Sequence, residues 1–339
     1  MTDNTKSIYN TMNEYLLTAS LLPGNTLTNV LLLLFGVGMV LKGADWLTEG
    51  AVSIAGKAGV SQMIIGLTIV AMGTSMPELC VSFVSALKGT SDIAIGNVVG
   101  SNIFNTLLIV GCSAMVAPVT IMKRTIWRDF PVAIAASVLL CIFAADNGIS
   151  RGESAALLAG FCIFMFFTLK NAKGSPKPET GDNAPSRQRT STVSCLLVIG
   201  GLACLIAGSN IFVEGSTFIA RQLGVSDAVI GLTIVAGGTS LPELATSVVA
   251  AKKGNSGIAI GNVLGSNVFN ILMIVGLTGT VCPMHITGIT LTDFAMLVAS
   301  ILLICIFSRT KYTIERWEGT VLTAIFIAYL AYLIATASA

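Results

Sequence analysis

Long apolar stretches, separated by short polar ones, run through almost the whole chain. Ten of them are long enough to cross a hydrocarbon core of roughly 30 Å as helices, which takes about 20 residues each. They cover residues 27–47, 60–87, 93–117, 130–146, 153–170, 194–220, 226–252, 258–283, 290–308 and 317–336. This pattern predicts an all-α polytopic membrane protein with ten transmembrane helices.

One interior stretch interrupts the pattern. Residues 171–193 consist mainly of Lys, Pro, Gly, Ser, Asp and Arg, which is typical of a flexible linker between two five-helix halves, 27–170 and 194–339. With ten spans, the loops on one side hold fourteen Lys and Arg residues and those on the other side hold four. The positive-inside rule then places the linker in the cytoplasm, and both termini, including an N-terminal tail of residues 1–26, outside it.

Composition excludes several classes of protein. Only 11% of the residues are charged and 54% are hydrophobic, whereas a soluble domain is about 25% charged. The net charge of +2 is too small for a nucleic-acid binder. His285 is the single histidine, so metal sites that need two imidazoles are excluded. The eight cysteines lie in apolar stretches without a CxxC pair, and we expect them to be small buried hydrophobic residues.

The chain contains an internal repeat. Gly66–Gly111 aligns with Gly231–Gly276 without gaps at an offset of 165, and 33 of the 46 positions are identical. Because each half has an odd number of spans, the second half would enter the membrane from the opposite face, as an inverted repeat. Weaker matching reaches Asp129 and Asp293, which we expect to cap the next helices. Identity concentrates in polar residues at mid-membrane depth, which duplication alone does not explain.

The first repeated string predicts a broken helix in each half, the second and the seventh. It reads GTSMPE at Gly73–Glu78 and GTSLPE at Gly238–Glu243. Proline inside a helix removes one donor and frees the carbonyl four residues earlier. Such a break in the membrane should line a cavity or find other partners. The carbonyl groups that we expect to be exposed are those of Gly73, Gly238, Ala71 and Ala236.

Each broken helix carries an acid near its middle, Glu78 or Glu243. A carboxylate at that depth costs several kcal/mol and by default marks an ion or proton path. Thr74 and Thr239 precede the acids by four residues and so share their helix face. Hydroxyl, carboxylate and carbonyl oxygens suit Ca²⁺ and Na⁺. A carboxylate that only packs against a neighbouring helix is the alternative, and the duplication of the arrangement disfavours it.

The second repeated string reads GNVVGSNIFN at 96–105 and GNVLGSNVFN at 261–270. Its GxxxG glycines favour close packing against the broken helix. We then expect the side-chain oxygens of its Ser and Asn residues to face the two carboxylates. These residues are Ser101, Asn105, Ser266 and Asn270. For the remaining amides, hydrogen bonding between helices is at least as good an interpretation as ion contact. These are Asn97, Asn102, Asn262 and Asn267.

The charge of the two central carboxylates limits which ions the protein can carry. Two central carboxylates neutralise one divalent cation or two monovalent ones, so both kinds should compete for one site, as in an exchanger. No basic residue lies beside the motifs, which disfavours an anion carrier. A channel could use similar ligands but would conduct without a counter-ion. An intramembrane enzyme is disfavoured because no nucleophile–His pair or HExxH is present.

The paired GTSxPEL and GNVxGSN motifs resemble the two alpha-repeats of the calcium/cation antiporter superfamily, most closely its prokaryotic sodium/calcium exchanger-like members, over nearly the whole chain. The resemblance implies a secondary active antiporter that exchanges Na⁺ for Ca²⁺ across the cell (inner) membrane by alternating access. It also implies four central cation sites, and first and sixth helices that slide across the rest. The implied ligands, by motif position, are Thr74, Ser75, Glu78, Ser101, Asn105, Thr239, Ser240, Glu243, Ser266 and Asn270, with the carbonyls of Ala71 and Ala236.

The chain departs from this pattern at one pair of positions. Many relatives carry Asp at one of the positions matched by Asn105 and Asn270, and here both are Asn. The number of Na⁺ ions exchanged, any K⁺ dependence and the response to pH therefore stay open. The superfamily also contains Ca²⁺/H⁺ exchangers, so the alternative is antiport of Ca²⁺ against H⁺, or of another divalent cation. We expect no resident cofactor and no obligate protein partner, only Ca²⁺ and Na⁺ bound in transit and the lipid bilayer around the chain.

Overall fold

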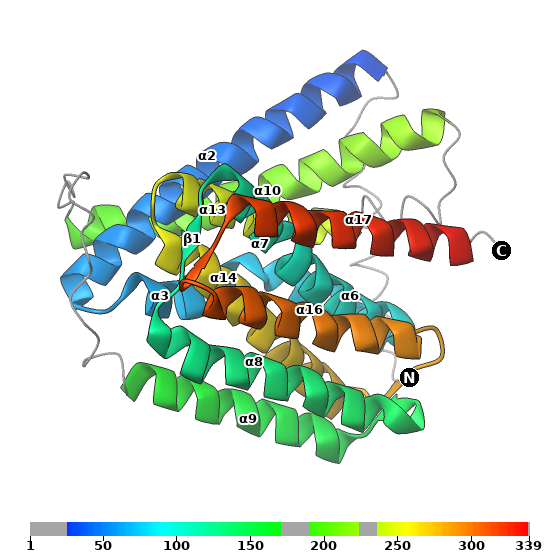
Figure 1. Ribbon diagram of the computed structural model, residues 1–339. Coiled ribbons are helices and arrows are strands. Elements are labelled where there is room, and N and C mark those ends of the chain that lie inside the picture. The colour runs from blue at the N-terminus through cyan, green and yellow to red at the C-terminus, as the bar shows by residue number, and fades with distance from the viewer. Residues whose placement is uncertain (1–25, 171–189, 224–235, 338–339) are drawn as a thin grey trace.

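The structure is a computed structural model that describes residues 26–170, 190–223 and 236–337. The expected N-terminal tail and most of the expected linker lie outside these residues, as does the beginning of the seventh expected span. Nearly all of the described chain is helical, and the helices run side by side across the molecule (Figure 1).

The described helices of the first half follow the expected order. The first span is α2 (Thr26–Ala58). The second is divided into α3 (Gln62–Ile65), the π-helical η1 (Gly66–Val70), α4 (Ala71–Thr74) and α5 (Met76–Leu87). The third comprises α6 (Ser91–Ile103), the π-helical η2 (Phe104–Ile109) and α7 (Val110–Val116). The last two are α8 (Lys123–Phe143), followed by the short η3 (Ala144–Asp146), and α9 (Arg151–Lys170).

The second half repeats this order over its described residues. It contains α10 (Ser191–Gln222), then α12 (Ala236–Thr239) and α13 (Leu241–Lys252). Next come α14 (Ser256–Val268), the π-helical η6 (Phe269–Val275) and α15 (Gly276–Val281). The half ends with α16 (Leu291–Arg309) and α17 (Arg316–Ala337).

The fold is that of a multi-pass membrane protein. Among the described residues, eight helical stretches are long and apolar enough to cross a membrane. Gln62–Thr74 and Met76–Leu87 form one more span with a 47° bend, which is the broken second helix. The seventh expected span begins outside the described residues, so the total of ten and the inverted arrangement of the halves stay predictions.

Two short antiparallel ladders tie loops of the two halves together. The strand β1 (Val119–Thr120) pairs with β4 (Thr313–Ile314). The strand β2 (Gly148–Ile149) pairs with β3 (Met284–His285). Because each ladder joins a loop of the first half to one of the second, the outer helices α8, α9, α16 and α17 are held in register around the centre (Figure 1).

A seam of glycines joins α2 to α10. A Cβ atom placed on Gly36 would lie 2.8 Å from the Gly208 carbonyl oxygen, and one on Gly43 would lie 2.8 Å from the Gly201 oxygen. One on Gly50 would lie 2.8 Å from the Ser194 oxygen. Since the pairing runs in opposite directions, the helices are antiparallel, and they lean away from the other helices together (Figure 1). The glycines recur every seven residues in both helices, a signal that the search for polar repeats missed.

Three expectations about individual residues change. Asp129 does not cap a helix, because α8 begins at Lys123 and leaves Asp129 buried inside it. Asp293 does stabilise a helix start, in a capping box in which Thr290 is the capping residue. The cysteines are free thiols, but Cys80, Cys162 and Cys195 are exposed rather than buried. The apolar surface of a membrane protein faces lipid, so these positions need no protein partner.

Candidate cation-binding site

Both broken helices are interrupted at the same serine of the repeated motif. Ser75 has φ −83° and ψ 10°, and Ser240 has φ −91° and ψ 6°. Each serine follows the last described residue of α4 or α12 and precedes α5 or α13. The motif prolines thereby fall in the first turn of the following helix, where a missing N–H is tolerated. The local sequence thus places a turn at mid-span and begins a new helix just before each glutamate.

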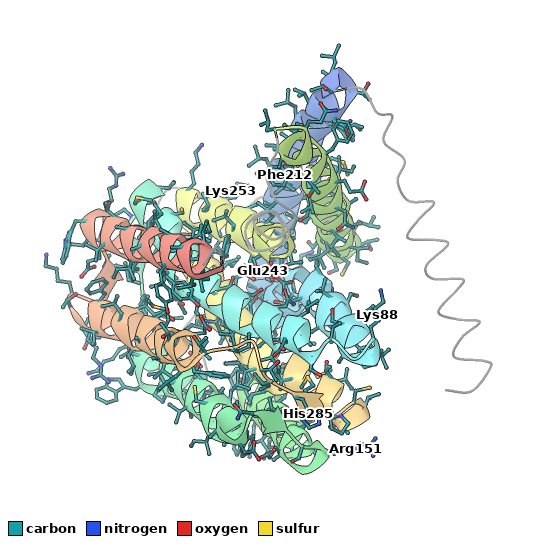
Figure 2. All side chains as sticks on the ribbon, turned by 90° about the vertical axis from the view of Figure 1, so that its right-hand side faces the viewer. Lys88, Arg151, Phe212, Glu243, Lys253 and His285 are labelled. Carbon is teal, nitrogen blue, oxygen red and sulfur yellow. The ribbon has the colours of Figure 1, made fainter. Side chains whose placement is uncertain are left out.

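The two breaks meet through reciprocal hydrogen bonds. The Ser75 hydroxyl donates to Glu243 Oε1 at 2.8 Å, and the Ser240 hydroxyl donates to Glu78 Oε1 at 2.9 Å. Both glutamates are buried, and they lie close enough to repel each other when both are charged. Glu243 lies in the interior, where helices of both halves meet (Figure 2). One site is therefore built from the two repeats.

The remaining hydroxyl groups of the predicted set gather around these acids. Ser101 Oγ lies 3.2 Å from the Ser240 hydroxyl oxygen. Thr74 and Ser266 lie beside the Glu243 carboxylate, and Thr239 lies beside that of Glu78. Among these side chains only Thr239 is partly exposed.

Four amides were open to two interpretations, interhelical hydrogen bonding or ion contact. Two of them form hydrogen bonds to the segments that carry the glutamates. Asn97 Nδ2 donates to the Glu78 backbone oxygen at 3.1 Å and to Ser82 at 2.9 Å. Asn262 Nδ2 makes the matching bonds to the Glu243 backbone oxygen and to Ser247, at 3.3 and 3.0 Å. In this structure both side chains serve as interhelical hydrogen-bond donors.

The other four amides cross between the halves. Asn105 Nδ2 donates to Asn267 Oδ1 at 3.1 Å, and Asn270 Nδ2 donates to Asn102 Oδ1 at 3.0 Å. Asn105 and Asn270 each lie in a π-helical turn, η2 or η6. Such turns are common at functional sites because they shift the helix register locally. Here they place one amide of each half against the opposite half.

Several buried oxygens at this centre have no hydrogen-bond partner among the described residues. They are Glu78 Oε2, Glu243 Oε2, Asn105 Oδ1, Asn270 Oδ1 and Ser266 Oγ. A buried polar atom without a partner is costly, and hard oxygens are the ligands that Ca²⁺ and Na⁺ prefer. Neither glutamate forms a salt bridge with a described Lys or Arg. The donor set therefore fits a cation.

The expectation of free carbonyls is wrong in two places. The Ala71 oxygen accepts a hydrogen bond from the Ser75 backbone N–H at 3.0 Å, so the helical bond persists across the break. The Gly238 oxygen accepts a bond from the Ser209 hydroxyl of α10. The Ala71 oxygen also lies 3.3 Å from the Thr74 hydroxyl. A ligand role for Ala71 stays a prediction, as it does for Ala236, the first described residue of α12.

Sequence reasoning passed over Ser82 and Ser247, which receive the Asn97 and Asn262 amides. The two serines occupy matching positions of the repeat and are identical in both copies. They lie one helical turn beyond the glutamates, outside the two strings that drew attention. A search of every identical polar position would have found them.

A multi-pass helical fold with a buried oxygen site between two broken helices is typical of secondary cation transporters. The model of the family described as sodium/calcium exchanger protein matches residues 28–170 and 193–335. The chain belongs to this family, which confirms the resemblance, and it is a cation antiporter rather than an enzyme.

Individual relatives agree with this assignment. The sodium/calcium exchanger MaX1 of Methanosarcina acetivorans is 35% identical, over 90% of this chain and 98% of its own. The inner membrane protein YrbG of Escherichia coli is 33% identical, over 89% and 95%. A solved structure of the sodium-calcium exchanger NCX_Mj, soaked with zero Na⁺ and Ca²⁺, matches with a TM-score of 0.80 and 33% identity, covering 91% of this chain and 100% of that one.

Proposed function

We propose that this protein exchanges Na⁺ for Ca²⁺ by alternating access, with the ions bound between Glu78 and Glu243. The reciprocal bonds from Ser75 and Ser240 carry the proposal, because they join each acid to the opposite repeat. Two carboxylates balance one Ca²⁺ or two Na⁺, so the two kinds of ion compete.

Loading and movement are coupled through charge. In the empty site the two carboxylates repel each other in surroundings from which water is excluded, where such repulsion is strong. A bound cation removes the repulsion and draws in the unpartnered oxygens of Asn105, Asn270 and Ser266. Only a loaded site would then allow the halves to exchange their conformations, which is the condition for antiport rather than leak.

The location is part of the same proposal. The protein spans the cytoplasmic (inner) membrane, with both termini outside and the linker inside. The excess of Lys and Arg on one set of loops supports this orientation.

Flux into proteoliposomes tests the proposal. We expect an imposed Na⁺ gradient to drive ⁴⁵Ca²⁺ uphill, and Glu78→Gln and Glu243→Gln to abolish that uptake. A unit charge pair at about 4 Å is worth about 4 kcal/mol at an effective dielectric constant of 20, so the loss should exceed about a hundredfold. Glu318→Gln is a matched control, because Glu318 is also buried but forms its bonds at the beginning of α17. Uptake at the control level in both site variants would refute the site.

Antiport of Ca²⁺ against H⁺ is the second candidate. Two carboxylates can release one divalent cation by taking up two protons, and the amide pair Asn105 and Asn270 adds no third acid. Imposing a pH gradient without Na⁺ separates the two candidates. Uptake of ⁴⁵Ca²⁺ driven by the pH gradient alone would favour this one, and uptake that requires Na⁺ would favour the first. Replacing Ca²⁺ by other divalent cations in the same assay identifies the cargo.

A further inference from the structure

A group of charged side chains outside the cation site joins the first helix to the second half of the chain. Lys253 Nζ contacts Asp45 Oδ1 and lies 3.8 Å from Glu49 Oε1. Both acids belong to α2, whereas Lys253 lies in the turn between α13 and α14. We call these three residues the Lys253 cluster. Lys42 also approaches Asp45, at 3.4 Å, but from within α2, so it joins no second helix.

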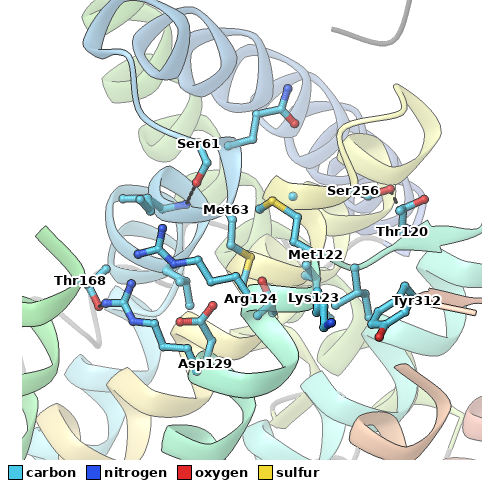
Figure 3. A pocket seen from close by; sticks show the side chains of 18 of the residues that line it. Ser61, Met63, Thr120, Met122, Lys123, Arg124, Asp129, Thr168, Ser256 and Tyr312 are labelled. Carbon is cyan, nitrogen blue, oxygen red and sulfur yellow. Dashed lines mark hydrogen bonds between the residues drawn. The ribbon is translucent and has the colours of Figure 1, made fainter. Parts of the chain in front are cut away.

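The turn that carries Lys253 is bonded to two further elements. The Asn255 side-chain oxygen accepts a hydrogen bond from Gln62 of α3 at 3.2 Å. The Ser256 hydroxyl oxygen accepts one from the Thr120 backbone N–H of β1 at 3.2 Å, beside the cavity in Figure 3. The α13–α14 turn is therefore held by α2, α3 and β1 together. We call this side of the molecule the β1 side.

The repeat places a matching turn near β3, which we call the β3 side. Lys88, which matches Lys253 at the offset of 165, follows α5 and precedes α6. Asp92 in the first turn of α6 accepts hydrogen bonds from the backbone N–H and the hydroxyl of Thr287, at 2.7 and 2.6 Å. Thr287 follows β3 by two residues. The two matching lysines thus lie in turns that contact different ladders.

The acids of the cluster also have matches, but the matching helices are packed differently. Glu214 of α10 matches Glu49, and Asn210 matches Asp45. In this structure α2 packs along α13. The matching helices α10 and α5 are not packed on each other in this way over their described residues. The structure therefore shows one of two arrangements that the repeat allows.

We propose that the Lys253 cluster keeps the β1 side closed, and that Lys88 and Glu214 form the equivalent ion pair when the β3 side closes instead. The inference rests on the alternating access of the proposed function, in which the two halves exchange conformations. In the opposite state α10 would lie along α5, as α2 lies along α13 here, and this brings Glu214 to Lys88. The cluster is thus a positioning device and not a part of the cation site.

The two sides would be held with unequal strength. The β1 side has two acids for its lysine, whereas on the β3 side Asn210 stands in place of Asp45 and only Glu214 is charged. A partly exposed ion pair shifts an equilibrium by up to about fivefold. The sequence therefore favours the state in which the β1 side is closed. This preference raises the apparent affinity for ions that arrive from the β3 side, because the state that can bind them is more populated.

Hydrogen–deuterium exchange of the purified full chain in lipid nanodiscs tests the proposal. The peptides of interest cover residues 57–66 and 253–262, where α3 lies against α14. Opening of the β1 side uncovers these amides, so their exchange rate follows the population of the open state. We expect Lys253→Gln to speed their exchange by about twofold to fivefold, the scale of a partly exposed ion pair.

Two substitutions in α10 give a sharper test, because they lie away from the α13–α14 turn. Asn210 is close to Gly208, which packs on Gly36 of α2, whereas the Lys253 cluster involves α2 at residues 45–49. Asn210→Asp gives the β3 side a second acid, and it should also speed exchange in the two peptides. Glu214→Gln removes the one acid of that side, and it should slow the exchange. A contact that only stabilises the α13–α14 turn would produce neither change.

Lys252→Gln is the matched control, because Lys252 is the neighbouring exposed lysine and forms no ion pair with a described acid. It should leave the exchange unchanged. Unchanged exchange in Lys253→Gln, or an equal increase in the control, would overturn the proposal. Unchanged exchange in both α10 variants would overturn it as well.

The design keeps this test separate from that of the proposed function. Exchange of amide hydrogens is measured without ion flux, so a failure here is distinct from retained uptake in the Glu78→Gln and Glu243→Gln variants. Should Lys253→Gln not fold, Asn210→Asp changes an exposed position of α10 and decides the question by itself.

Discussion

The two copies of the second repeated string have nearly the same sequence but different surroundings. In α14 every residue from Ile258 to Val268 is buried, and Gly265 presses on η1. In α6 Gly100 is exposed and Asn97 is half-buried. Residues 231–235, which match η1 in the repeat, lie outside the described chain. The comparison teaches that nearly the same string can be tightly covered in one copy and leave a glycine exposed in the other, so the string alone does not determine how its surface is packed.

Replacing a glycine in each copy by a larger residue should give the largest difference in stability between matched variants of the two copies. A Cβ atom on Gly265 would lie 2.7 Å from the Leu67 Cα and carbonyl oxygen, which are backbone atoms. Gly265→Leu should therefore destabilise the fold by at least the roughly 1–3 kcal/mol that overpacking costs. Gly100→Leu should leave thermal unfolding in detergent nearly unchanged but impair exchange, because alternating access must cover that face in the other state. Equal thermal stability of the two variants would contradict the comparison.

A smaller effect, equal in the two halves, is expected from the serines at the breaks. Ser75→Ala and Ser240→Ala each leave one glutamate oxygen without its donor, a change of about 1–3 kcal/mol. If the hydroxyls are cation ligands, Ca²⁺ affinity measured by calorimetry falls about tenfold or more in both variants. If they only stabilise the empty carboxylates, the affinity rises instead. Ser113→Ala is the control, because that hydroxyl is buried without a partner among the described residues.

The smallest difference concerns the amides that support the glutamate segments. Asn262 is fully buried and also lies 3.1 Å from the Thr74 hydroxyl, whereas Asn97 is partly exposed. Asn262→Ala should cost about 1–3 kcal/mol of stability, because its partners are left buried and unpaired. Asn97→Ala should cost less, since water replaces the lost bonds. Thermal unfolding of both variants measures the difference, and a larger loss in Asn97→Ala would reverse the comparison.

Much of the fold and of the site was predictable because a membrane imposes simple rules. Hydropathy located the spans, and proline with mid-span glutamate located the breaks. The resemblance to the antiporter superfamily, carried over by motif position, implied that Ser75 and Ser240 belong to one centre. The repeat could not predict which side chains form hydrogen bonds with each other across that centre. It shows which positions correspond in the two halves, and not which residues are in contact. The π-helical turns at Asn105 and Asn270 were equally hidden, since no residue type codes for one extra residue in a turn.

The beginning of α8, seven residues earlier than expected, shows a second limit of prediction from sequence. Lys123, Arg124 and Arg128 made residues 123–129 resemble a loop, so the helix was expected from residue 130. In the structure these residues belong to the first turns of α8, and Asp129 is buried. Hydropathy cannot distinguish a polar loop from a polar helix end at the membrane surface, because both expose charge.

The glycine seam has a consequence for the history of the gene. Gly36 faces Gly208, which corresponds to Gly43 in the other copy, and Gly43 faces Gly201, which corresponds to Gly36. After the ancestral segment was duplicated, each of these glycines therefore packed against the copy of a different glycine of the ancestral helix. Enlarging any one of them would separate both backbones, so the two descendants inherited a joint constraint and could not drift apart independently.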